Sequence, residues 1–454
     1  MPGPAACRAR CRRSCGPSTT SRASSSCRRR RVSGGQRPSA VSTTRIALLG
    51  FGTVGQAVAR LILAQPDVSL THVFNRHVAR KRVDWLPGVT WTESIDDILA
   101  ARPDIVIEVV GGRDPAGHWI AQALASGADV VTANKQLIAN EGDRLLADAS
   151  RNGRRLLFEA AVAGGIPVIR GIREGLAGDR LTRVLGVLNG TCNYILTRME
   201  SAHLGFDEAL AEAQAAGFAE ADPTDDLDGY DARAKLSILA RVALGYALPP
   251  ERIACGSIRP VRDIDFVYAA QLGTTIRQVS RAIVEGDGLV AGVTPGLVPT
   301  GAPLARAVRN QNIVVVTGDA GGDTGFFGFG AGGGPTAVAV MSDVLALSGH
   351  RVAAPAGTPD ARQPVSVRAG MRERQYVRFV VDDRPGIIAA IASACAAHAI
   401  NIDSVLQIPW ADKQALPFVV TLDPCEPASL VPALAAMRAL PFNVAEPFAM
   451  PFVE

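Results

Sequence analysis

Residues 217–235 hold the densest cluster of side chains that could do chemistry. Lys235 follows Asp231 by four residues, so the simplest interpretation of these two is a surface pair on one helix face. That pair leaves the rest of the loop unexplained. Six carboxylates in so short a segment repel one another unless cations or a cationic group of a substrate face them. The six are Glu220, Asp222, Asp225, Asp226, Asp228 and Asp231. The loop therefore predicts a site for a small, positively charged group.

A glycine-rich motif at residues 50–55, G-F-G-T-V-G, predicts a dinucleotide site. It lies between an expected strand at 46–49 and an expected helix at 54–63, the context that makes the motif informative. Gly50 permits the tight turn, Gly52 lets the backbone approach a pyrophosphate, and Gly55 allows helix and strand to pack closely. The free N–H groups at the start of the helix would then bind the anion. The expected contacts are Gly50, Phe51, Gly52, Thr53, Val54 and Gly55.

The end of the second expected strand, at 70–74, indicates which cofactor fits. A carboxylate there would bind the 2′-hydroxyl of NAD. Instead the strand is followed by Asn75 and Arg76, and the first acid is Asp84. Arginine suits the 2′-phosphate of NADP, so NADP is expected, with NAD as the alternative. If residues 80–82 are only a solvated helix face, Arg76 is the sole evidence for NADP.

Lys135 follows the expected strand at 130–132. Ligands of open parallel sheets lie at the carboxyl ends of the strands, so this lysine can face both the nicotinamide and the substrate. The alternative is an ordinary surface lysine.

The elements that must position these residues form three groups. Alternating apolar runs and helical stretches over 44–165, which end with an expected helix at 143–150 and an expected strand at 156–160, predict an α/β fold with a Rossmann-type parallel sheet. Residues 166–350 predict an inserted α+β domain for catalysis and dimerisation, with strands at 181–188, 278–284, 289–293 and 313–317. Its glycine-rich stretch, 318–334, leads into a last helix at 337–347 that returns to the cofactor domain. A polar linker, 351–373, precedes a ferredoxin-like βαββαβ unit at 374–454.

The motifs, taken in their order along the chain, resemble those of homoserine dehydrogenases with a C-terminal ACT domain. The resemblance extends from residue 44 to the C-terminus. The resemblance rests on the motif at 50–55, V-T-A-N-K at 131–135, E-A-A-V-A-G-G-I-P at 159–167, L-N-G-T-C-N-Y-I at 188–195 and G-F-A-E-A-D-P-T-D-D-L-D-G at 217–229. It implies reversible reduction of L-aspartate 4-semialdehyde to L-homoserine with NAD(P)H, in the biosynthesis of threonine, methionine and isoleucine.

The resemblance also implies roles for single residues. Lys235 would donate a proton to the carbonyl as hydride arrives, oriented by Asp226 and Asp231. Glu220 would bind the substrate ammonium, and Lys135 would contact both cofactor and substrate. The further contacts implied are Asn189, Gly190 and Thr191 for the substrate, and Thr132 and Gly330, in the turn 328–332, for the cofactor.

The family also holds a sodium ion near the junction of the first two domains. By position its ligands would be the backbone carbonyls of Glu159, Val162, Gly164 and Ile166. A glycine-rich turn with exposed carbonyls suits such a hard cation. The alternative is an ordinary Gly-Gly crossover between domains.

The C-terminal unit implies regulation by an amino acid, with threonine as the expected effector. D-D-R-P-G at 382–386 lies where the first strand turns into the first helix, and Gly386 there would let a carboxylate approach free N–H groups. Residues 401–404 would add polar contacts. Alternatively, these residues only cap a helix and the unit only joins subunits. Because ACT units pair sheet to sheet, a homodimer or homotetramer is expected. Removal of the chain after Arg351 is expected to keep catalysis and abolish inhibition.

Composition excludes several other classes. Residues 1–43 hold ten arginines and no acid, so a chain with a net charge of +4 has an acidic remainder, and no nucleic-acid groove is expected. We interpret this leader as a disordered tail or as translation from too far upstream; a transit peptide and a nucleic-acid-binding tail are the alternatives. No apolar run reaches the roughly 18 residues of a membrane span. Scattered cysteines indicate a reducing, cytoplasmic location.

Two rival functions are weighed against this interpretation. Cys192 could be the nucleophile of a phosphorylating semialdehyde dehydrogenase, but such a thiol needs a base or cation, and the nearest histidine in sequence is His203. The other rival is an amino-acid sensor without catalysis, against which Lys135, Glu220 and Lys235 argue.

Overall fold

The computed structural model describes residues 43–349, 361–364, 366–410 and 412–453. The expected leader therefore lies, but for its last residue, outside the described residues, as does much of the expected linker. No helix in the described part of the chain is long and apolar enough to cross a membrane.

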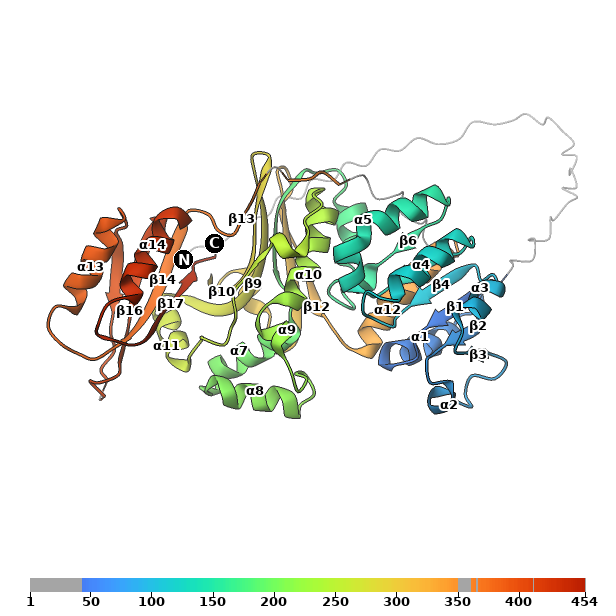
Figure 1. The fold of residues 1–454 in the computed structure, drawn as a ribbon, viewed down its shortest axis with the longest axis horizontal. Coiled ribbons are helices and arrows are strands. Elements are labelled where there is room, and N and C mark those ends of the chain that lie inside the picture. Colours follow the sequence, from blue (N-terminus) through green and yellow to red (C-terminus); the bar gives the residue numbers. More distant parts are fainter. Residues whose placement is uncertain (1–42, 350–360, 365, 411, 454) are drawn as a thin grey trace, which may run out of the picture. The chain divides into compact units, whose positions relative to one another are not determined.

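The first sheet has six parallel strands in the order β3-β2-β1-β4-β5-β6, which confirms the Rossmann-type sheet (Figure 1). Its strands are β1 (Thr44–Leu49), β2 (Val68–Phe74), β3 (Thr90–Thr92), β4 (Ile105–Glu108), β5 (Asp129–Thr132) and β6 (Leu156–Leu157). Its helices are α1 (Thr53–Leu63), α2 (Val78–Lys81), α3 (Ile95–Ala100), α4 (Ala116–Ala125), α5 (Lys135–Arg151) and, from the far end of the chain, α12 (Gly333–Leu347).

Both faces of this sheet are buried because successive side chains of a strand point to opposite sides. Ala47 and Leu49 pack in the core that includes α4 and α5, whereas Ile46 and Leu48 pack in the core that includes α1 and α12. The chain thus returns to the cofactor domain through α12, as the sequence predicts.

Several elements of this part differ from the sequence expectation. The short strand β3 and helix α3 were not expected. The expected strand at 156–160 ends at Leu157 and continues as a 3₁₀ turn, Glu159–Ala161. Helix α5 was expected over 143–150 but begins at Lys135, because the side-chain oxygen of Asn134 accepts the Leu137 N–H and caps the helix there.

The second sheet is mixed, with seven strands: the order is β12-β11-β7-β9-β10-β13, and β8 also pairs with β10. The strands are β7 (Leu181–Val187), β8 (Ala254–Cys255), β9 (Thr274–Glu285), β10 (Gly288–Pro299), β11 (Gln311–Gly318), β12 (Gly322–Phe329) and β13 (Val367–Arg368). The accompanying helices are α7 (Gly190–Ala202), α8 (Phe206–Ala215), α9 (Thr224–Leu227), α10 (Tyr230–Leu239) and α11 (Asp263–Gln271). Strand β12 lies within the expected glycine-rich stretch, where antiparallel pairing with β11 holds it extended.

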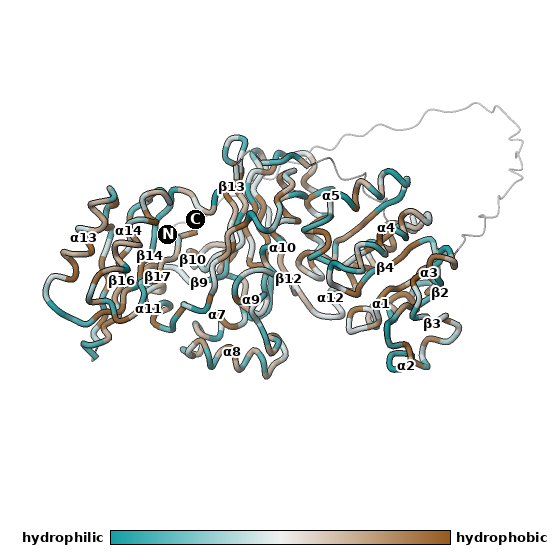
Figure 2. The backbone as a smooth tube through the Cα atoms, in the orientation of Figure 1, coloured by the Kyte–Doolittle hydropathy of each residue, from teal (hydrophilic) through white to brown (hydrophobic). Residues whose placement is uncertain are grey.

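The third sheet is antiparallel, in the order β15-β16-β14-β17, and confirms the ferredoxin-like unit. Its elements are β14 (Glu373–Val381), α13 (Ile387–Ala397), β15 (Ile402–Leu406), β16 (Leu416–Cys425), α14 (Pro427–Arg438) and β17 (Asn443–Pro451). The tube of α13 is coloured hydrophobic over much of its length (Figure 2). Ile387 and Ile391 on this helix are buried, whereas Ile388 is exposed.

The third sheet shares a core with the second domain. Tyr376 and Met450 of the third sheet pack in one cluster with Phe266 and Tyr268 of α11. In the stretch expected to be a linker, Arg362 bridges to Tyr246 and β13 pairs with β10. The C-terminal unit is therefore built into the catalytic domain by side-chain packing and by backbone pairing.

Candidate active site

A cavity of 540 Å³ lies where the carboxyl ends of the first sheet meet the helices of the second domain. The cofactor side contributes Val109, Gly111 and Lys135, and the catalytic side contributes Phe218 and Lys235. Of the site residues predicted from sequence, those that line it are Val54, Lys135, Gly164, Asn189, Gly190, Thr191, Asp226, Asp231, Lys235 and Gly330.

The glycine turn at 50–55 has the geometry that a pyrophosphate needs. Gly50 has a φ of 101°, and a side chain at Gly55 would lie 2.2 Å from the carbonyl oxygen of Gly50. These two positions therefore exclude side chains. Nothing lies within 4 Å of the place a Cβ of Gly52 would occupy, so its backbone is open to a ligand at the start of α1.

Two residues predicted to contact the cofactor turn their side chains inward. Phe51 is buried and packs edge-on against Trp91, with ring centroids 4.8 Å apart. Thr132 is buried, and its hydroxyl donates a hydrogen bond of 2.6 Å to Glu108. Any cofactor contact of these two residues would come from their backbones, a distinction that motif spacing does not carry.

Asp231 joins the two predicted lysines. One carboxylate oxygen accepts a hydrogen bond of 2.7 Å from Lys235, and the other lies 3.1 Å from the Lys135 ammonium. Burial raises the pKa of Asp231, but the charges of Lys235 and Lys135 outweigh burial and hold that pKa well below its usual value. The Asp231 charge in turn raises the pKa of Lys135. Both lysines thus meet at one carboxylate at the edge of the cavity.

Lys235 is held from a second direction. Lys235 is only 9% exposed. Its ammonium also donates a hydrogen bond of 2.8 Å to the carbonyl of Leu188, and that carbonyl accepts a second hydrogen bond from the Asn312 side chain. Asn189 caps α7 and donates to Asp226 at 2.6 Å and to Asp231 at 2.9 Å. Burial raises the pKa of Asp226. This network fixes the ammonium in one position, as proton transfer to a bound carbonyl requires.

The structure does not bring Glu220 or Arg76 into the cavity. Glu220 is exposed, although Gly217 and Phe218 of the same loop line the cavity. Arg76 is exposed just after β2. The expected roles of both residues stay predictions.

The turn predicted to bind sodium packs against the turn that holds Gly330. Ala163 and Gly164 have φ values of 54° and 51°, and a side chain on Gly164 would lie 2.6 Å from the carbonyl oxygen of Gly330. The Glu159 carboxylate is occupied, because it accepts the N–H groups of Ile169 and Arg170 at 2.9 and 2.8 Å. No cluster of three or more His, Cys, Asp or Glu residues suited to a metal is found in the described ranges. The expected carbonyl ligands stay a prediction.

Cys192 lacks the exposure and the lowered pKa of a nucleophile. It is fully buried, its thiol donates to the Asp226 carbonyl at 3.1 Å, and burial raises its pKa well above the usual value. The thiolate that a phosphorylating dehydrogenase needs is therefore disfavoured.

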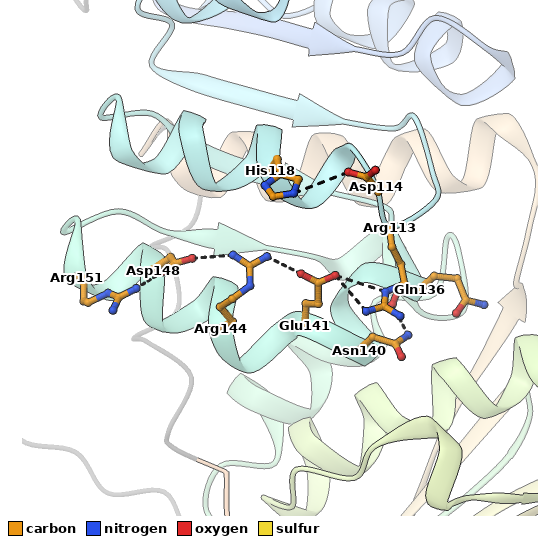
Figure 3. A network of polar contacts seen from close by, with 9 residues as sticks. All are labelled: Arg113, Asp114, His118, Gln136, Asn140, Glu141, Arg144, Asp148 and Arg151. Atoms are coloured by element: carbon orange, nitrogen blue, oxygen red, sulfur yellow. Dashed lines mark hydrogen bonds and ion pairs between the residues drawn. The ribbon is translucent and has the colours of Figure 1, made fainter.

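A row of charged side chains runs along the exposed face of α5 (Figure 3). Arg144 lies between Glu141 and Asp148, and Glu141 also contacts Arg113, 3.4 Å away, from the loop after β4. Pairs this exposed contribute little stability singly. The Arg113 contact nevertheless ties the loop that lines the cavity to the helix that begins at Lys135.

The sequence analysis did not single out Asn134, which lines the cavity, or Glu108 and Asn312, whose hydrogen bonds hold residues of the site. Glu108 is buried at the end of β4 and Asn134 caps α5. For Glu108 the available signal was an acid at a strand end before a Gly-Gly pair, and for Asn134 its place within V-T-A-N-K.

A Rossmann sheet whose glycine turn opens near a cavity with two lysines defines a nicotinamide-dependent oxidoreductase. Family models match the chain in three parts: the homoserine dehydrogenase NAD-binding domain at 50–159, homoserine dehydrogenase at 167–345 and the ACT domain at 375–442. The chain belongs to the homoserine dehydrogenase family and carries a C-terminal ACT domain.

Relatives agree over nearly the whole described chain. The homoserine dehydrogenase of Bacillus subtilis is 37% identical over 383 residues, which are 80% of this chain and 88% of the relative. A crystal structure of the Thiobacillus denitrificans homoserine dehydrogenase superimposes with a TM-score of 0.83 at 33% identity, covering 90% of this chain and 98% of that one. A hyperthermophilic archaeal homoserine dehydrogenase in complex with NADPH gives a TM-score of 0.58 at 29% identity, covering 67% and 97%.

Proposed function

We propose that the enzyme reversibly reduces L-aspartate 4-semialdehyde to L-homoserine with NADPH in threonine, methionine and isoleucine biosynthesis, and that threonine inhibits it through the ACT domain. This proposal rests mainly on the buried Lys235 ammonium, which is held between the Leu188 carbonyl and Asp231 at the cavity beside the glycine turn. In this proposal residues 44–165 bind the cofactor, 166–350 bind substrate, and 374–454 regulate, in a cytoplasmic enzyme.

The residues of the cavity divide the chemistry among them. A nicotinamide bound at the carboxyl edge of the sheet would supply or accept the hydride. Lys235 donates the proton to the carbonyl oxygen of the semialdehyde, and takes it back from the hydroxyl of homoserine in the reverse direction. Asp231 and Asn189 keep that ammonium aimed at the cavity, and Lys135 adds a positive charge that favours the developing alkoxide.

Substrate recognition rests on the acidic loop and on the start of α7. Glu220 is the proposed partner of the substrate ammonium; it lies two residues beyond Phe218, which lines the cavity. The backbone of Gly190 and Thr191 borders the same cavity. A carboxylate for the ammonium and a fixed proton donor for the carbonyl match the two ends of an amino-acid semialdehyde.

One assay tests this function: homoserine oxidation followed by nicotinamide absorbance with NADP and with NAD, each with and without threonine. We expect turnover without phosphate, faster with NADP, and lower with threonine. Turnover of the semialdehyde that depends on phosphate would instead support a cysteine-based dehydrogenase.

We assign NADP preference to Arg76, which lies just after β2. No carboxylate occurs between the end of β2 and Asp84. Arg76→Ala should weaken NADP more than NAD, because only NADP carries the 2′-phosphate. The effect should be modest, since an exposed charge pair is worth about 1 kcal/mol or less. Equal changes in the Kd of both cofactors would show that Arg76 does not discriminate.

The proposed sodium ion would bind the carbonyls of Glu159, Val162, Gly164 and Ile166. Support comes from the turn itself, because two consecutive left-handed residues, Ala163 and Gly164, curl the backbone next to the cavity. Carbonyl oxygens of such a turn suit a hard cation. The ion would then hold the end of the cofactor domain against the Gly330 turn of the catalytic domain.

Threonine inhibition is assigned to the start of α13. Gly386 has a φ of 97° with nothing within 4 Å of its Cβ position, so a carboxylate can approach the first N–H groups of this eleven-residue helix. Gly386→Asp should abolish threonine inhibition and spare catalysis, because it places negative charge at the carboxylate site. Gly386→Ala is the matched control, since it brings the same backbone strain without the charge. If the Asp variant remains as sensitive as the Ala variant, threonine acts elsewhere.

A homodimer or homotetramer is proposed to form in part through the ACT unit. Exposed apolar residues on it support this: Ile388 on α13, Val405 on the edge strand β15, and Trp410 beyond that strand. Pairing would remove these side chains from water.

A further inference from the structure

Glu108 is a buried carboxylate that no sequence motif marked and that the chemistry above does not use. It ends β4, lies between Leu49 of β1 and Thr132 of β5 in the sheet, and is 0% exposed. Burial of a carboxylate is costly unless its oxygens are satisfied. One oxygen accepts the N–H groups of Val110 and Gly111 at 2.8 and 3.1 Å, and the other accepts the Thr132 hydroxyl at 2.6 Å.

These bonds give the carboxylate the role of a pure acceptor. The Thr132 oxygen itself accepts the Asn134 N–H at 3.0 Å, so the hydroxyl proton is directed to Glu108. A distance of 2.6 Å is typical of a hydroxyl that donates to a charged oxygen. The geometry therefore places a fixed negative charge in the interior, directly behind the carboxyl edge of the sheet.

The same bonds join two walls of the cavity. One wall is the loop after β4, where Gly111 and Gly112 have φ values of 80° and 75° and which therefore needs hydrogen bonds to hold its shape. The other is the start of α5, where Asn134 caps the helix and also donates to the Gly112 carbonyl at 2.5 Å. Lys135 is the next residue.

We propose that Glu108 is a positioning residue for the dehydrogenase reaction. It holds the loop 109–112 against the start of α5, and so fixes the position of Lys135 relative to a bound nicotinamide. Val109, Val110, Gly111 and Asn134 line the cavity, whereas Glu108 and Thr132 do not, so Glu108 acts through its neighbours. Its charge would have a second effect on a nicotinamide bound in this cavity, because a nearby negative charge favours the oxidised, positively charged form over the neutral reduced one.

The test compares Glu108→Gln with Asp129→Asn in the full-length enzyme. Asp129 is the matched control: it is also a mostly buried carboxylate, on the neighbouring strand, but it pairs with Arg155 at the other end of β5. We expect Glu108→Gln to lower kcat about 10- to 100-fold, the usual effect of small misplacement, and to raise the Kd of NADP⁺ more than that of NADPH. Asp129→Asn should leave both the rate and the Kd ratio unchanged.

Thr132→Val keeps the carboxylate and the shape of the side chain while removing the hydroxyl, so it serves if Glu108→Gln does not fold. It should lower kcat and change the KM for homoserine, while the ratio of the two cofactor Kd values stays native because the charge remains. A folded Glu108→Gln enzyme with native kcat and a native Kd ratio would overturn the proposal. So would a Thr132→Val enzyme with native kcat and KM.

Discussion

Lys235→Ala is expected to lower kcat by about 10²–10⁴, the range for a positioned acid–base group, while the protein stays folded. The ammonium has two fixed acceptors, the Leu188 carbonyl at 2.8 Å and Asp231 at 2.7 Å, and it lines the cavity. No second ammonium can take its place, because Lys135 approaches Asp231 from the cofactor side. Steady-state kinetics of homoserine oxidation measure the loss.

Lys235→Met is the companion variant, because it keeps most of the aliphatic stem and so separates the lost charge from the lost packing. Both variants should have similar kcat and nearly native KM for the cofactor. Asp231 keeps Lys135 as a partner in each. A folded variant of either kind that turns over at a near-native rate would remove Lys235 from the mechanism.

How well the sequence predicts this molecule depends on where the partners of each residue lie. The glycine turn at 50–55 and the pair Asp231 and Lys235 are local, so spacing alone predicts their contacts. It suggests an exposed pair, however, whereas the structure buries both Asp231 and Lys235. The contacts of Lys235 with Leu188 and of Lys135 with Asp231 join segments 47 and 96 residues apart in the chain. Only the resemblance to a family, not the spacing of residues, suggested that these segments share one site.

The burial of other residues could not be predicted, because a buried polar residue looks the same in the sequence as an exposed one. Glu108 and Asp265 are both fully buried carboxylates, yet each stands in the sequence among residues typical of a strand end or a helix start. Strand β12 was missed for a similar reason, since the pairing with β11 that holds it extended is a tertiary contact. Glycine content alone favours a loop there.

Arg378→Met is expected to destabilise the described chain, which begins at Thr43, by about 3–5 kcal/mol, the usual cost of breaking a buried ion pair. Asp265 of α11 accepts hydrogen bonds from the Tyr376 hydroxyl at 2.6 Å, from the Arg378 guanidinium and from the Arg262 N–H at 2.8 Å. Arg378→Met leaves the Asp265 carboxylate buried without its cation. Thermal or urea unfolding measures the loss.

Arg374→Met on the same strand is the control. Arg374 pairs with Asp403 at 2.7 Å, but both side chains are about one third exposed, so its loss should cost less than about 1 kcal/mol.

The pH dependence of the Arg378→Met deficit gives a second check. Burial raises the pKa of Asp265 while Arg378 opposes that rise, so removing Arg378 raises it further. Because a carboxyl with a raised pKa in the folded state destabilises that state once it ionises, the deficit of Arg378→Met should shrink as the pH falls. A deficit independent of pH would assign the loss to packing alone.

The junction between α11 and the third sheet, which Asp265 and Arg378 hold together, is also linked to the active site. Arg378 also donates to the Pro260 carbonyl at 3.0 Å, and the residues just before Pro260 hold the acidic loop: Ile258 donates to the Leu227 carbonyl at 3.1 Å and Ser257 to the Asp228 carboxylate at 2.6 Å. That loop carries Asp226. Removal of the chain after Arg351, which the sequence alone predicts to spare catalysis, would therefore expose the apolar residues that α11 shares with the third sheet and loosen the acidic loop as well. We expect such a truncated enzyme to be less stable and less active than the Gly386→Asp variant, which leaves this junction intact.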